Sequence, residues 1–433
     1  MLERAGRSVQ DHLVSQRGFA GRVRFFAIET GLAAIAGVVT AVFSVWLFTR
    51  LDFEVMCRSL DLWFDSDPIR IVAALTSRFD QMHFRSSIHP LWSIGVATPF
   101  LALVKLVGVK AMVTTYVGFS AAAFGATIFA ALRMLRLGRL DSYLLLGLCL
   151  STSSAWLWLG IAEIFPLGAV SMVIPMIWLA APRGGHDRWS APLQSLVSLA
   201  ITITNWVAGL LAAFLALGLR GAAQTGMIAF TAAGLITVVQ YRFFPQSGAY
   251  FNIWTEETVY GTTGTFLQHA RTFFLSTIAA PAPDLMDVAK GIQPGDRLSR
   301  LQFAPPTFSP VGLAALGLWA VLALRGLWAA ANGAVSLQIA SFVLGMILFN
   351  FALHAVYGIE TFLYSLHFLP FFTFVAAWSL LPARGRTIMR AAIAAAIVFG
   401  MIHNFALFEL MAGWHNAIPP ELVADPRAVE SCR

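Results

Sequence analysis

The chain has 433 residues, of which 29 are Lys or Arg and 22 are Asp or Glu, so its formal net charge is +7. Charged residues make up only 12% of the chain and hydrophobic residues 58%. This balance excludes a water-soluble enzyme, whose surface needs more charge, and it excludes a disordered chain. The composition is typical of a polytopic membrane protein. The basic residues lie in the first 24 residues and in short turns between apolar segments, which favours a role in membrane orientation over nucleic-acid binding.

The first apolar segment spans 30–49 and holds no charged residue. Arg17, Arg22 and Arg24 precede it, so the positive-inside rule places the N-terminus in the cytoplasm. A cleaved signal peptide usually has a shorter apolar core and a small-residue cleavage site. We therefore expect this segment to remain as the first membrane anchor.

The polarity of the chain after this anchor determines the predicted topology. Segment 50–87 holds six acidic residues and is expected outside. Segment 89–108 is apolar, but if it crosses the membrane, the three arginines within 133–139 fall outside, against the positive-inside rule. We therefore predict that 89–108 dips into the membrane or lies at its interface as a juxtamembrane helix.

The whole chain, 1–433, is predicted to form one all-α, polytopic bundle of transmembrane helices with about eleven spans and its C-terminus outside. Asn205-Trp206 interrupts an apolar run and predicts two short helices there, although one tilted helix across the break is an alternative. The long outer segment 242–309 is expected to hold short amphipathic helices lying on the membrane. The expected spans are 30–49, 112–132, 143–160, 165–181, 193–204, 207–219, 227–239, 311–324, 336–357, 368–381 and 391–408.

Only three cysteines are present, so the chain has no disulfide framework and no CxxC metal motif. Cys57 and Cys432 both fall outside in this topology, which allows a disulfide between them.

The expected topology separates the charged residues by side. The cytoplasmic turns hold mainly arginine, whereas the acidic residues and most histidines fall on the outer side. Ionisable groups near membrane depth are costly and usually mark function, so we expect the chemistry at the outer face.

Two carboxylates one residue apart, Asp65 and Asp67, lie in the first outer loop, followed by Pro68. Such a pair can supply a general base with an orienting partner, or bind a divalent cation. Asp67 also fits the N-cap of a helix that begins at Pro68, but capping leaves Asp65 unexplained.

Arg85 and His89 lie just before the apolar segment 89–108. Arginine is suited to bidentate phosphate recognition, and the alternative is an interfacial charge among lipid headgroups. Glu163 stands alone in an outer turn, where it is either a solvated carboxylate or a substrate ligand. Asn205, at the helix break, is a candidate cavity residue; an interfacial anchor at Trp206 is the simpler explanation.

Glu360, Tyr364 and His367 follow i, i+4, i+7 spacing, which places them on one face if the region is helical. We expect this face to line a polar cavity. His354 and His403 are also near outer ends, and for both a satisfied interfacial histidine is the favoured interpretation.

Several catalytic motifs are missing from the sequence. It has no GxxxxGK[ST], no HExxH and no strand-turn-helix context for GxGxxG. Energy coupling by a nucleotide and zinc-dependent hydrolysis are therefore not expected.

These motifs resemble the GT-C superfamily of integral-membrane glycosyltransferases, near the protein O-mannosyltransferases and the lipid A aminoarabinose transferase. That class carries an acidic motif in the first outer loop, as at Asp65 and Asp67, and a His-Pro-Pro-like signature, as at His89. It also has a basic cytoplasmic turn, here 133–139. The chain departs from the pattern in having Asp-x-Asp rather than Asp-Glu, and Leu91 for the second proline. The strings that look like a bacterial branch are FDSDPIR, SSIHPLW, AEIFPLG, TNW and ETFLYSLHFLP.

The resemblance implies transfer of a sugar from a polyprenyl-phosphate-linked donor to a glycan, lipid or protein acceptor outside the bacterial inner membrane. It implies Asp65 or Asp67 as the general base, with Arg85 and His89 near the phosphate. A divalent cation, Mg²⁺ or Mn²⁺, is compatible but not required, and no nucleic-acid partner is expected. The residues expected to line the sugar or acceptor pocket are Glu163, Asn205, Glu360, Tyr364 and His367.

Two other functions are compatible with the sequence. A lipid or solute transporter would also use broken helices and carboxylates, but it predicts inverted repeats, and the two halves show no convincing self-similarity. A polysaccharide polymerase or ligase would share the outer site and the lipid-linked substrate, but would rely on a large outer loop rich in Arg and His.

Overall fold

The structure is a computed structural model that describes residues 19–58, 62–80, 83, 89–181, 189–247, 265–289, 297–303, 307–357 and 361–419. Nearly all of its regular structure is helical. The main helices are α2 (Phe19–Phe48), α3 (Phe53–Arg58), α4 (Pro68–Thr76), α5 (Pro90–Trp92), α6 (Thr98–Val107), α7 (Val109–Met134), α8 (Arg139–Leu150), α9 (Ser153–Trp158), α10 (Phe165–Ala180), α11 (Ser190–Ile201), α12 (Trp206–Phe243), α14 (Phe266–Arg271), α15 (Pro310–Ala331), α16 (Leu337–His354), α17 (Ser365–Trp378) and α18 (Arg386–Ala417).

Short turns and one hairpin connect these helices. The π-helical turns η2 (Ser93–Ala97) and η6 (Thr272–Ser276) extend α5 and α14, and the 3₁₀ turns η4 (Ile203–Asn205) and η7 (Thr361–Tyr364) precede α12 and α17. Strands β1 (Pro283–Ala289) and β2 (Arg297–Phe303) pair antiparallel within the long outer segment.

Within the described residues, eight helices are long and apolar enough to cross a membrane, and α10 and α11 are shorter apolar helices. The chain is therefore a helical, multi-pass membrane protein, as its composition predicts. The expected count of eleven spans is not reproduced one for one. The predicted span 143–160 is divided into α8 and α9, and the predicted spans 207–219 and 227–239 both lie within α12.

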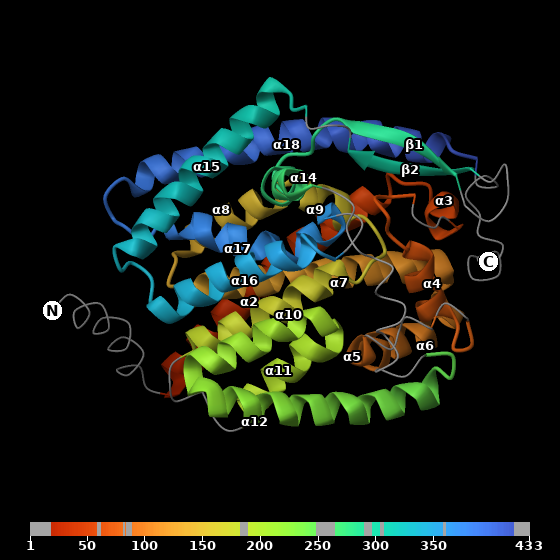
Figure 1. The fold of residues 1–433 in the computed structure, drawn as a ribbon, viewed down its shortest axis with the longest axis horizontal. Coiled ribbons are helices and arrows are strands. Elements are labelled where there is room, and N and C mark those ends of the chain that lie inside the picture. Colours follow the sequence, from red (N-terminus) through yellow and green to blue (C-terminus); the bar gives the residue numbers. More distant parts are fainter. Residues whose placement is uncertain are drawn as a thin grey trace.

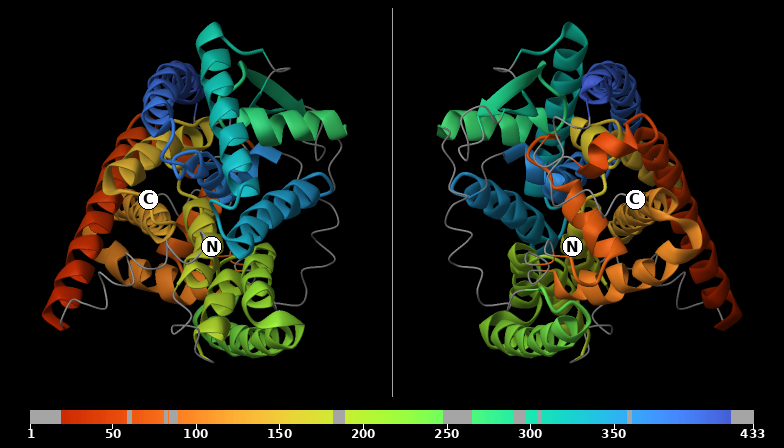
Figure 2. Two further views of the ribbon diagram at one scale, coloured as in Figure 1. Left: turned by 90° about the vertical axis from the view of Figure 1, so that its left-hand side faces the viewer. Right: turned by 90° about the vertical axis from the view of Figure 1, so that its right-hand side faces the viewer.

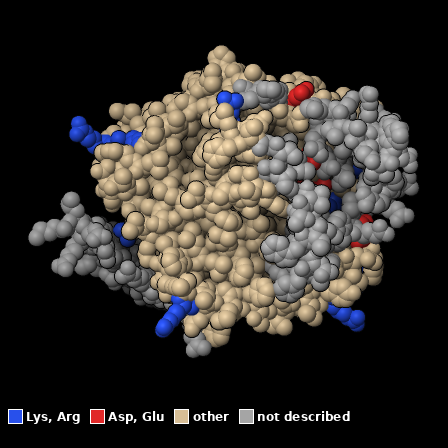
Figure 3. Space-filling view, in the orientation of Figure 1, with Lys and Arg blue, Asp and Glu red and all other residues tan. Residues whose placement is uncertain are grey.

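The helices surround α17, whose residues are all buried (Figure 1). The end-on views of Figure 2 show α2 on one flank, α16 on the other, and α15 with α18 opposite α11 and α12. On the face drawn in Figure 3, acidic side chains gather at the right-hand end, over the region of α3 and α4 in Figure 1, while basic side chains lie mainly at the left-hand and lower edges. This separation agrees with the charge segregation expected from the sequence.

At the end of the bundle opposite α3, the half-buried Glu29 and the buried Asp141 pair with the expected cytoplasmic arginines. Glu29 Oε2 accepts a hydrogen bond from Arg133 Nε at 2.8 Å and Glu29 Oε1 pairs with Arg139 Nη2 at 3.0 Å. Asp141 pairs with Arg390 Nε at 2.7 Å. These pairs join α2 to the 133–139 turn and α8 to α18.

The expected break at Asn205-Trp206 is present, and the alternative of one tilted helix is wrong. The extended backbone of Thr202, three residues before Asn205, and the 3₁₀ turn η4 separate α11 from α12, and the two helices pack against each other. A second bend lies inside α12 at Gly218, whose φ of 73° and ψ of −176° lie outside the helical region and suit glycine. The chain therefore folds back on itself twice between Ser190 and Phe243.

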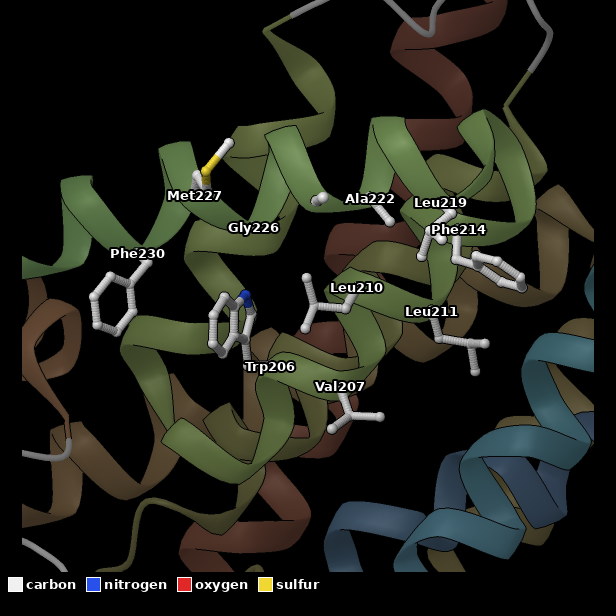
Figure 4. Close-up of a pocket in the computed structure, with 11 residues that line it drawn as sticks. Trp206, Val207, Leu210, Leu211, Phe214, Leu219, Ala222, Gly226, Met227 and Phe230 are labelled. Atoms are coloured by element: carbon white, nitrogen blue, oxygen red, sulfur yellow. The ribbon is translucent and has the colours of Figure 1, made fainter.

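The bend at Gly218 creates an apolar groove between the two halves of α12 (Figure 4). Its volume is about 720 Å³, and every side chain lining it is apolar except for the indole nitrogen of Trp206. Trp206 stacks on Phe230 at 5.9 Å between ring centroids, which closes the end nearest η4. Trp206 directly follows Asn205, so the groove begins beside the helix break.

Segment 89–108 forms the continuous unit α5–η2–α6, which begins at Pro90 as the His-Pro pair predicts. Its length and composition would allow it to cross a membrane. In Figure 1, however, α5 is seen nearly end-on at the right-hand end of the molecule, whereas α12 and α18 run across the picture. That the segment lies at the membrane interface rather than across the membrane stays a prediction.

The β1–β2 hairpin was not predicted from the sequence. It lies in the long outer segment, where only short helices were expected; α14 with η6 is such a helix. The hairpin is tied to the first outer loop because Leu301 donates its amide to the Leu62 carbonyl at 2.7 Å and accepts the Phe64 amide at 3.1 Å. Two outer segments far apart in sequence are therefore joined through their backbones.

Cys57 is disulfide-bonded and buried, and Cys149 is a free, buried thiol. The expected partner, Cys432, lies outside the described residues. We predict that a non-reducing peptide map of the purified chain contains a reductant-sensitive link between the peptides carrying Cys57 and Cys432. Cys57→Ser should abolish this link and lower the thermal midpoint, because the link closes a very long loop. A map with both cysteines alkylated and unlinked would contradict the pairing.

Candidate functional site

The first outer loop makes a tight turn before α4. Phe64 and Asp65 have φ angles of 51° and 67°, a left-handed conformation that is uncommon for residues other than glycine. Ser66 donates its amide to the Trp63 carbonyl at 3.0 Å and closes the turn. Two successive left-handed residues store backbone strain, and such strain concentrates at functional sites. The turn leaves the half-buried Asp65 and Asp67 beside each other.

Glu163 holds this turn from the other side. Its carboxylate accepts the Asp67 amide at Oε1, 2.8 Å away, and the Ile164 amide at Oε2, 3.3 Å away. The residue is only 1% exposed. The interpretation of Glu163 as a solvated carboxylate in an outer turn is therefore wrong, and its two backbone contacts identify it as a positioning group for the acidic turn.

A cation and a chain of hydrogen bonds complete the surroundings of Glu163. Arg70 Nη2, one turn into α4, lies 4.0 Å from Glu163 Oε2. Trp92 Nε1 donates to the Tyr116 hydroxyl at 3.2 Å, which donates to the Glu163 carbonyl at 3.1 Å. The side chain and the backbone of Glu163 are thus both fixed, from α4, α5 and α7.

Burial raises the pKa of Glu163 to about 7. The positive charge of Arg70 and the two amide hydrogen bonds lower this pKa, and the nearby Asp67 charge raises it, but burial dominates. Near neutral pH this carboxyl group therefore exchanges a proton beside the acidic turn.

An aromatic cluster joins the first outer loop to the later outer segments. The Phe64 ring lies 4.7 Å from Phe303 on β2 and 5.3 Å from Phe362 on η7, centroid to centroid. Trp158 Nε1 donates to the Phe362 carbonyl at 3.1 Å, and its ring packs edge-on against Phe165 at 5.1 Å. The cluster places Asp65 next to the start of α10 and α17.

Asn205, at the helix break, contacts the first turns of α10. Its Nδ2 donates to the Gly168 carbonyl at 2.9 Å and to Ser171 Oγ at 3.0 Å. Asn205 is 2% exposed, so its amide supports α10 rather than facing solvent.

His367 also packs on Gly168. A Cβ added to Gly168 would lie 2.2 Å from His367 Nε2, so only glycine leaves room for the imidazole. Tyr364 lies 6.2 Å from His367 and 6.1 Å from Phe165 between ring centroids. The 163–168 segment therefore contacts the first outer loop, the helix break and the start of α17.

His89 is linked to the candidate site through the end of α11. Its Nδ1 hydrogen-bonds the Ile201 carbonyl at 2.6 Å, where the last turn of α11 leaves a carbonyl unpaired, and the imidazole is 6% exposed. His89 thus joins α5 to the end of α11, close in sequence to Asn205. Arg85 and Glu360 lie outside the described residues.

Two further expectations need correction. α4 begins at Pro68 with Asp67 at the N-cap position, as predicted, but the Asp67 side chain makes no capping hydrogen bond. Tyr364 and His367 do not lie in one regular helix, because a 3₁₀ turn ends at Tyr364 and α17 starts at Ser365; the expected face shared with Glu360 falls outside the described residues. His403 is a satisfied histidine, as expected, bonded to Ser309 Oγ and to the Ala280 carbonyl.

Sequence reasoning missed four residues of this site. Arg70, Tyr116, Trp92 and Gly168 were not singled out, since their roles depend on packing between distant helices. For Arg70 the signal was its position one helical turn after Asp67. For Gly168 the signal was its place in the AEIFPLG string, three residues after the start of α10.

Comparison of the chain with protein-family models, with curated proteins and with solved structures finds no match. What the fold and composition define is a multi-pass helical membrane protein. The half-buried acidic turn, the Asn205 amide and the His367 imidazole meet at the 163–168 segment.

Gly168→Ala should lower the thermal midpoint in detergent, because the new methyl group displaces the buried His367 ring. We expect a loss of about 1–3 kcal/mol in stability, typical of overpacking. Gly317→Ala is the matched control, since a Cβ there meets nothing within 4 Å. Equal behaviour of the two variants would show that His367 does not pack on Gly168.

Glu163→Gln should remove a pH dependence of stability. In the wild type the pKa of Glu163 rises on folding from about 4.5 to about 7, so the folded chain holds a proton that the unfolded chain has lost. The free energy of unfolding contributed by this group therefore falls as pH rises between these values. Thermal midpoints of the wild type and of Glu163→Gln across pH 4–8 measure this contribution. The midpoint of the wild type relative to that of the variant should decrease as the pH rises. A constant difference would contradict the burial of Glu163.

Proposed function

We propose that the chain is a membrane glycosyltransferase that moves a sugar from a polyprenyl-phosphate-linked donor to an acceptor hydroxyl at the extracytoplasmic face. The observation that carries the proposal is the strained acidic turn at Asp65 and Asp67, held by buried Glu163 at one end of a membrane bundle. Its support from the sequence is the resemblance to GT-C enzymes.

The acidic turn suits general-base catalysis. Inversion at the sugar carbon requires a base that takes the proton of the acceptor hydroxyl while the lipid phosphate leaves. Asp65 and Asp67 are half-buried, and the backbone of their turn is fixed, so either carboxylate can be held in one geometry without reorganisation. Arg70 supplies a nearby positive charge of the kind that stabilises an anionic leaving group.

The surroundings of the site suit a lipid-linked donor. The apolar groove of α12 starts at Trp206, beside Asn205, and so lies next to the residues that contact the 163–168 segment. α5 also meets this region, through Trp92 and His89. A donor with its head at the acidic turn would have an apolar surface on the exposed side of α12 near it.

A divalent cation at the acidic turn stays a prediction from the sequence. Among the described residues, no group of three His, Cys, Asp or Glu side chains is arranged to hold a metal ion. The carboxylates are therefore assigned a role in proton transfer, and no step is assigned to a metal.

The disulfide of Cys57 supports the proposed orientation. Cys57 lies in α3, at the same end as the acidic turn, and disulfides persist in oxidising compartments outside the cytoplasm.

A transfer assay tests the proposal. Purified chain in lipid nanodiscs is mixed with radiolabelled polyprenyl-phosphate sugars and a membrane-envelope acceptor extract. Asp65→Asn or Asp67→Asn should reduce transfer about 100-fold or more, the usual contribution of a general base, whereas Asp284→Asn on the exposed hairpin should not. Full transfer by both variants of the acidic turn would reject the assignment.

A further inference from the structure

Exposed aromatic and basic side chains gather where the end of α12 meets the chain that follows α4. Phe79, Tyr241 and Phe243 are 65%, 60% and 41% exposed, and their sequence neighbours Arg78 and Arg242 are also exposed. We call these five residues the α12-end patch. No residue of the patch belongs to the candidate site, and no step of the proposed function uses it. Large aromatic side chains grouped on a surface mark a place where a lipid or another partner binds.

The depth of the α12-end patch in the membrane follows from α12 itself. After the bend at Gly218, residues 219–243 extend ~37 Å as a helix, somewhat more than the ~30 Å hydrocarbon core of a bilayer. Leu235, Val238 and Val239 are exposed, so aliphatic side chains cover this helix until just before the patch. A change from aliphatic to aromatic and basic side chains at the end of a span marks the level of the lipid headgroups. Figure 1 draws this end of α12 below α6, at the end of the bundle that also holds α4.

Arg78 is held in place by the last turn of α12. Its Nε donates to the Phe243 carbonyl at 2.9 Å, and the last carbonyls of a helix have no partner within the helix. The guanidinium carbon lies 5.4 Å from the centroid of the Phe79 ring and 5.8 Å from the centroid of the Phe243 ring, within the range of cation–π attraction. These three contacts restrict the guanidinium group before any ligand binds.

The remaining N–H groups of Arg78 indicate the chemistry of a partner. Its two Nη atoms make no hydrogen bond among the described residues, and no described carboxylate forms an ion pair with Arg78 or Arg242. A planar cation with free N–H groups matches the oxygens of a phosphate group. A metal cation would be repelled by the two arginines. A soluble anion would gain nothing from the three exposed rings, whereas aromatic rings are favoured at the level of lipid phosphates.

The orientation of the chain in the membrane does not account for these two arginines. Arg133, Arg139 and Arg390 lie at the end of the bundle where the positive-inside rule expects basic residues. Arg78 and Arg242 lie instead at the end that carries the acidic turn. A local partner is therefore the better explanation, and the phosphate groups of the leaflet at that end supply one.

We propose that the α12-end patch binds the phosphate headgroup of a phospholipid in the leaflet nearest the acidic turn, with Arg78 as its main ligand. Arg242 adds a second positive charge, and the three aromatic side chains lie among the headgroups and the first carbons of the acyl chains. Helix α4 extends over ~14 Å, so the bound headgroup holds one end of the helix whose other end carries Asp67. This inference does not depend on the transfer of a sugar.

Photolabelling of the purified full chain tests the patch. The chain is kept in alkyl maltoside micelles, which contain no phosphate, with a trace of phosphatidylglycerol that carries a diazirine in its headgroup. The matched probe is diacylglycerol with the same diazirine and no phosphate. Phosphatidylglycerol should label the peptides that contain 77–79 and 241–243 about fivefold more than diacylglycerol does, because only the former offers an acceptor to the guanidinium. Millimolar inorganic phosphate should not displace it, since the acyl chains keep the probe beside the patch.

Variants of the patch separate its charge from its rings. Arg78→Gln should lower the labelling about tenfold, the effect of losing one charge-assisted hydrogen bond. Phe79→Leu keeps an apolar side chain but removes one ring from the guanidinium, and should lower the labelling about threefold. Arg220→Gln is the matched control and should leave the labelling of the patch unchanged, because Arg220 is an exposed arginine of the same helix beside the Gly218 bend. If Arg78→Gln does not fold, the two probes compared on the wild type decide.

Each contrary outcome overturns lipid binding. Equal labelling by the two probes would show that the phosphate is not recognised, and wild-type labelling of Arg78→Gln would show that Arg78 is not its ligand. Displacement by inorganic phosphate would assign the patch to a soluble anion. Loss of labelling as the chain dimerises at higher concentration would assign the patch to a contact between two copies.

Discussion

The described site depends on one buried carboxylate. Glu163 accepts the backbone amides of Asp67 and Ile164, and so ties the first outer loop to the start of α10. A buried carboxylate is costly unless its oxygens are bonded, and here the cost is offset by two amides and the nearby guanidinium of Arg70. The same six-residue stretch, 163–168, also contacts Asn205 and His367. Any displacement of Glu163 would therefore move the first outer loop, the helix break at Asn205 and the start of α17 relative to one another.

This arrangement explains how segments scattered along the chain meet at one end of the bundle. The Leu301 backbone pairs with the first outer loop, the Trp158 indole holds Phe362, and the Asn205 amide holds Gly168. The first contact joins the β1–β2 hairpin to the first outer loop, and the other two join later segments to α9 and α10. The acidic turn, the helix break and the start of α17 are therefore positioned by hydrogen bonds rather than by apolar packing alone, which gives them defined geometry within a membrane protein.

Much of the architecture could be predicted from hydropathy and charge, and the predictions that were wrong have physical causes. The break at Asn205-Trp206 and the helix start at Pro68 were predicted because polar residues and proline act locally. The division of 143–160 into α8 and α9, the bend at Gly218 and the β1–β2 hairpin were missed, since a bend within an apolar run leaves hydropathy unchanged. Asp67 and Glu163 were singled out from residue type. They are 96 residues apart in sequence, however, so their contact arises only from the packing of the folded chain. The partners of buried polar groups, such as Tyr116 and Gly168, were unpredictable for the same reason.

The central claim is that the first outer loop and the segment before α17 meet beside the 163–168 segment. Cysteine cross-linking in native membranes tests it most directly. In a chain whose own cysteines are replaced by alanine, Phe64→Cys and Phe362→Cys should be joined by a short bifunctional thiol reagent, because the two native rings pack at 5.3 Å between centroids. Phe64→Cys paired with Leu337→Cys, at the opposite end of α16 from His354, should remain unlinked. Linking of both pairs, or of neither while each single thiol stays reactive, would contradict the convergence of these segments.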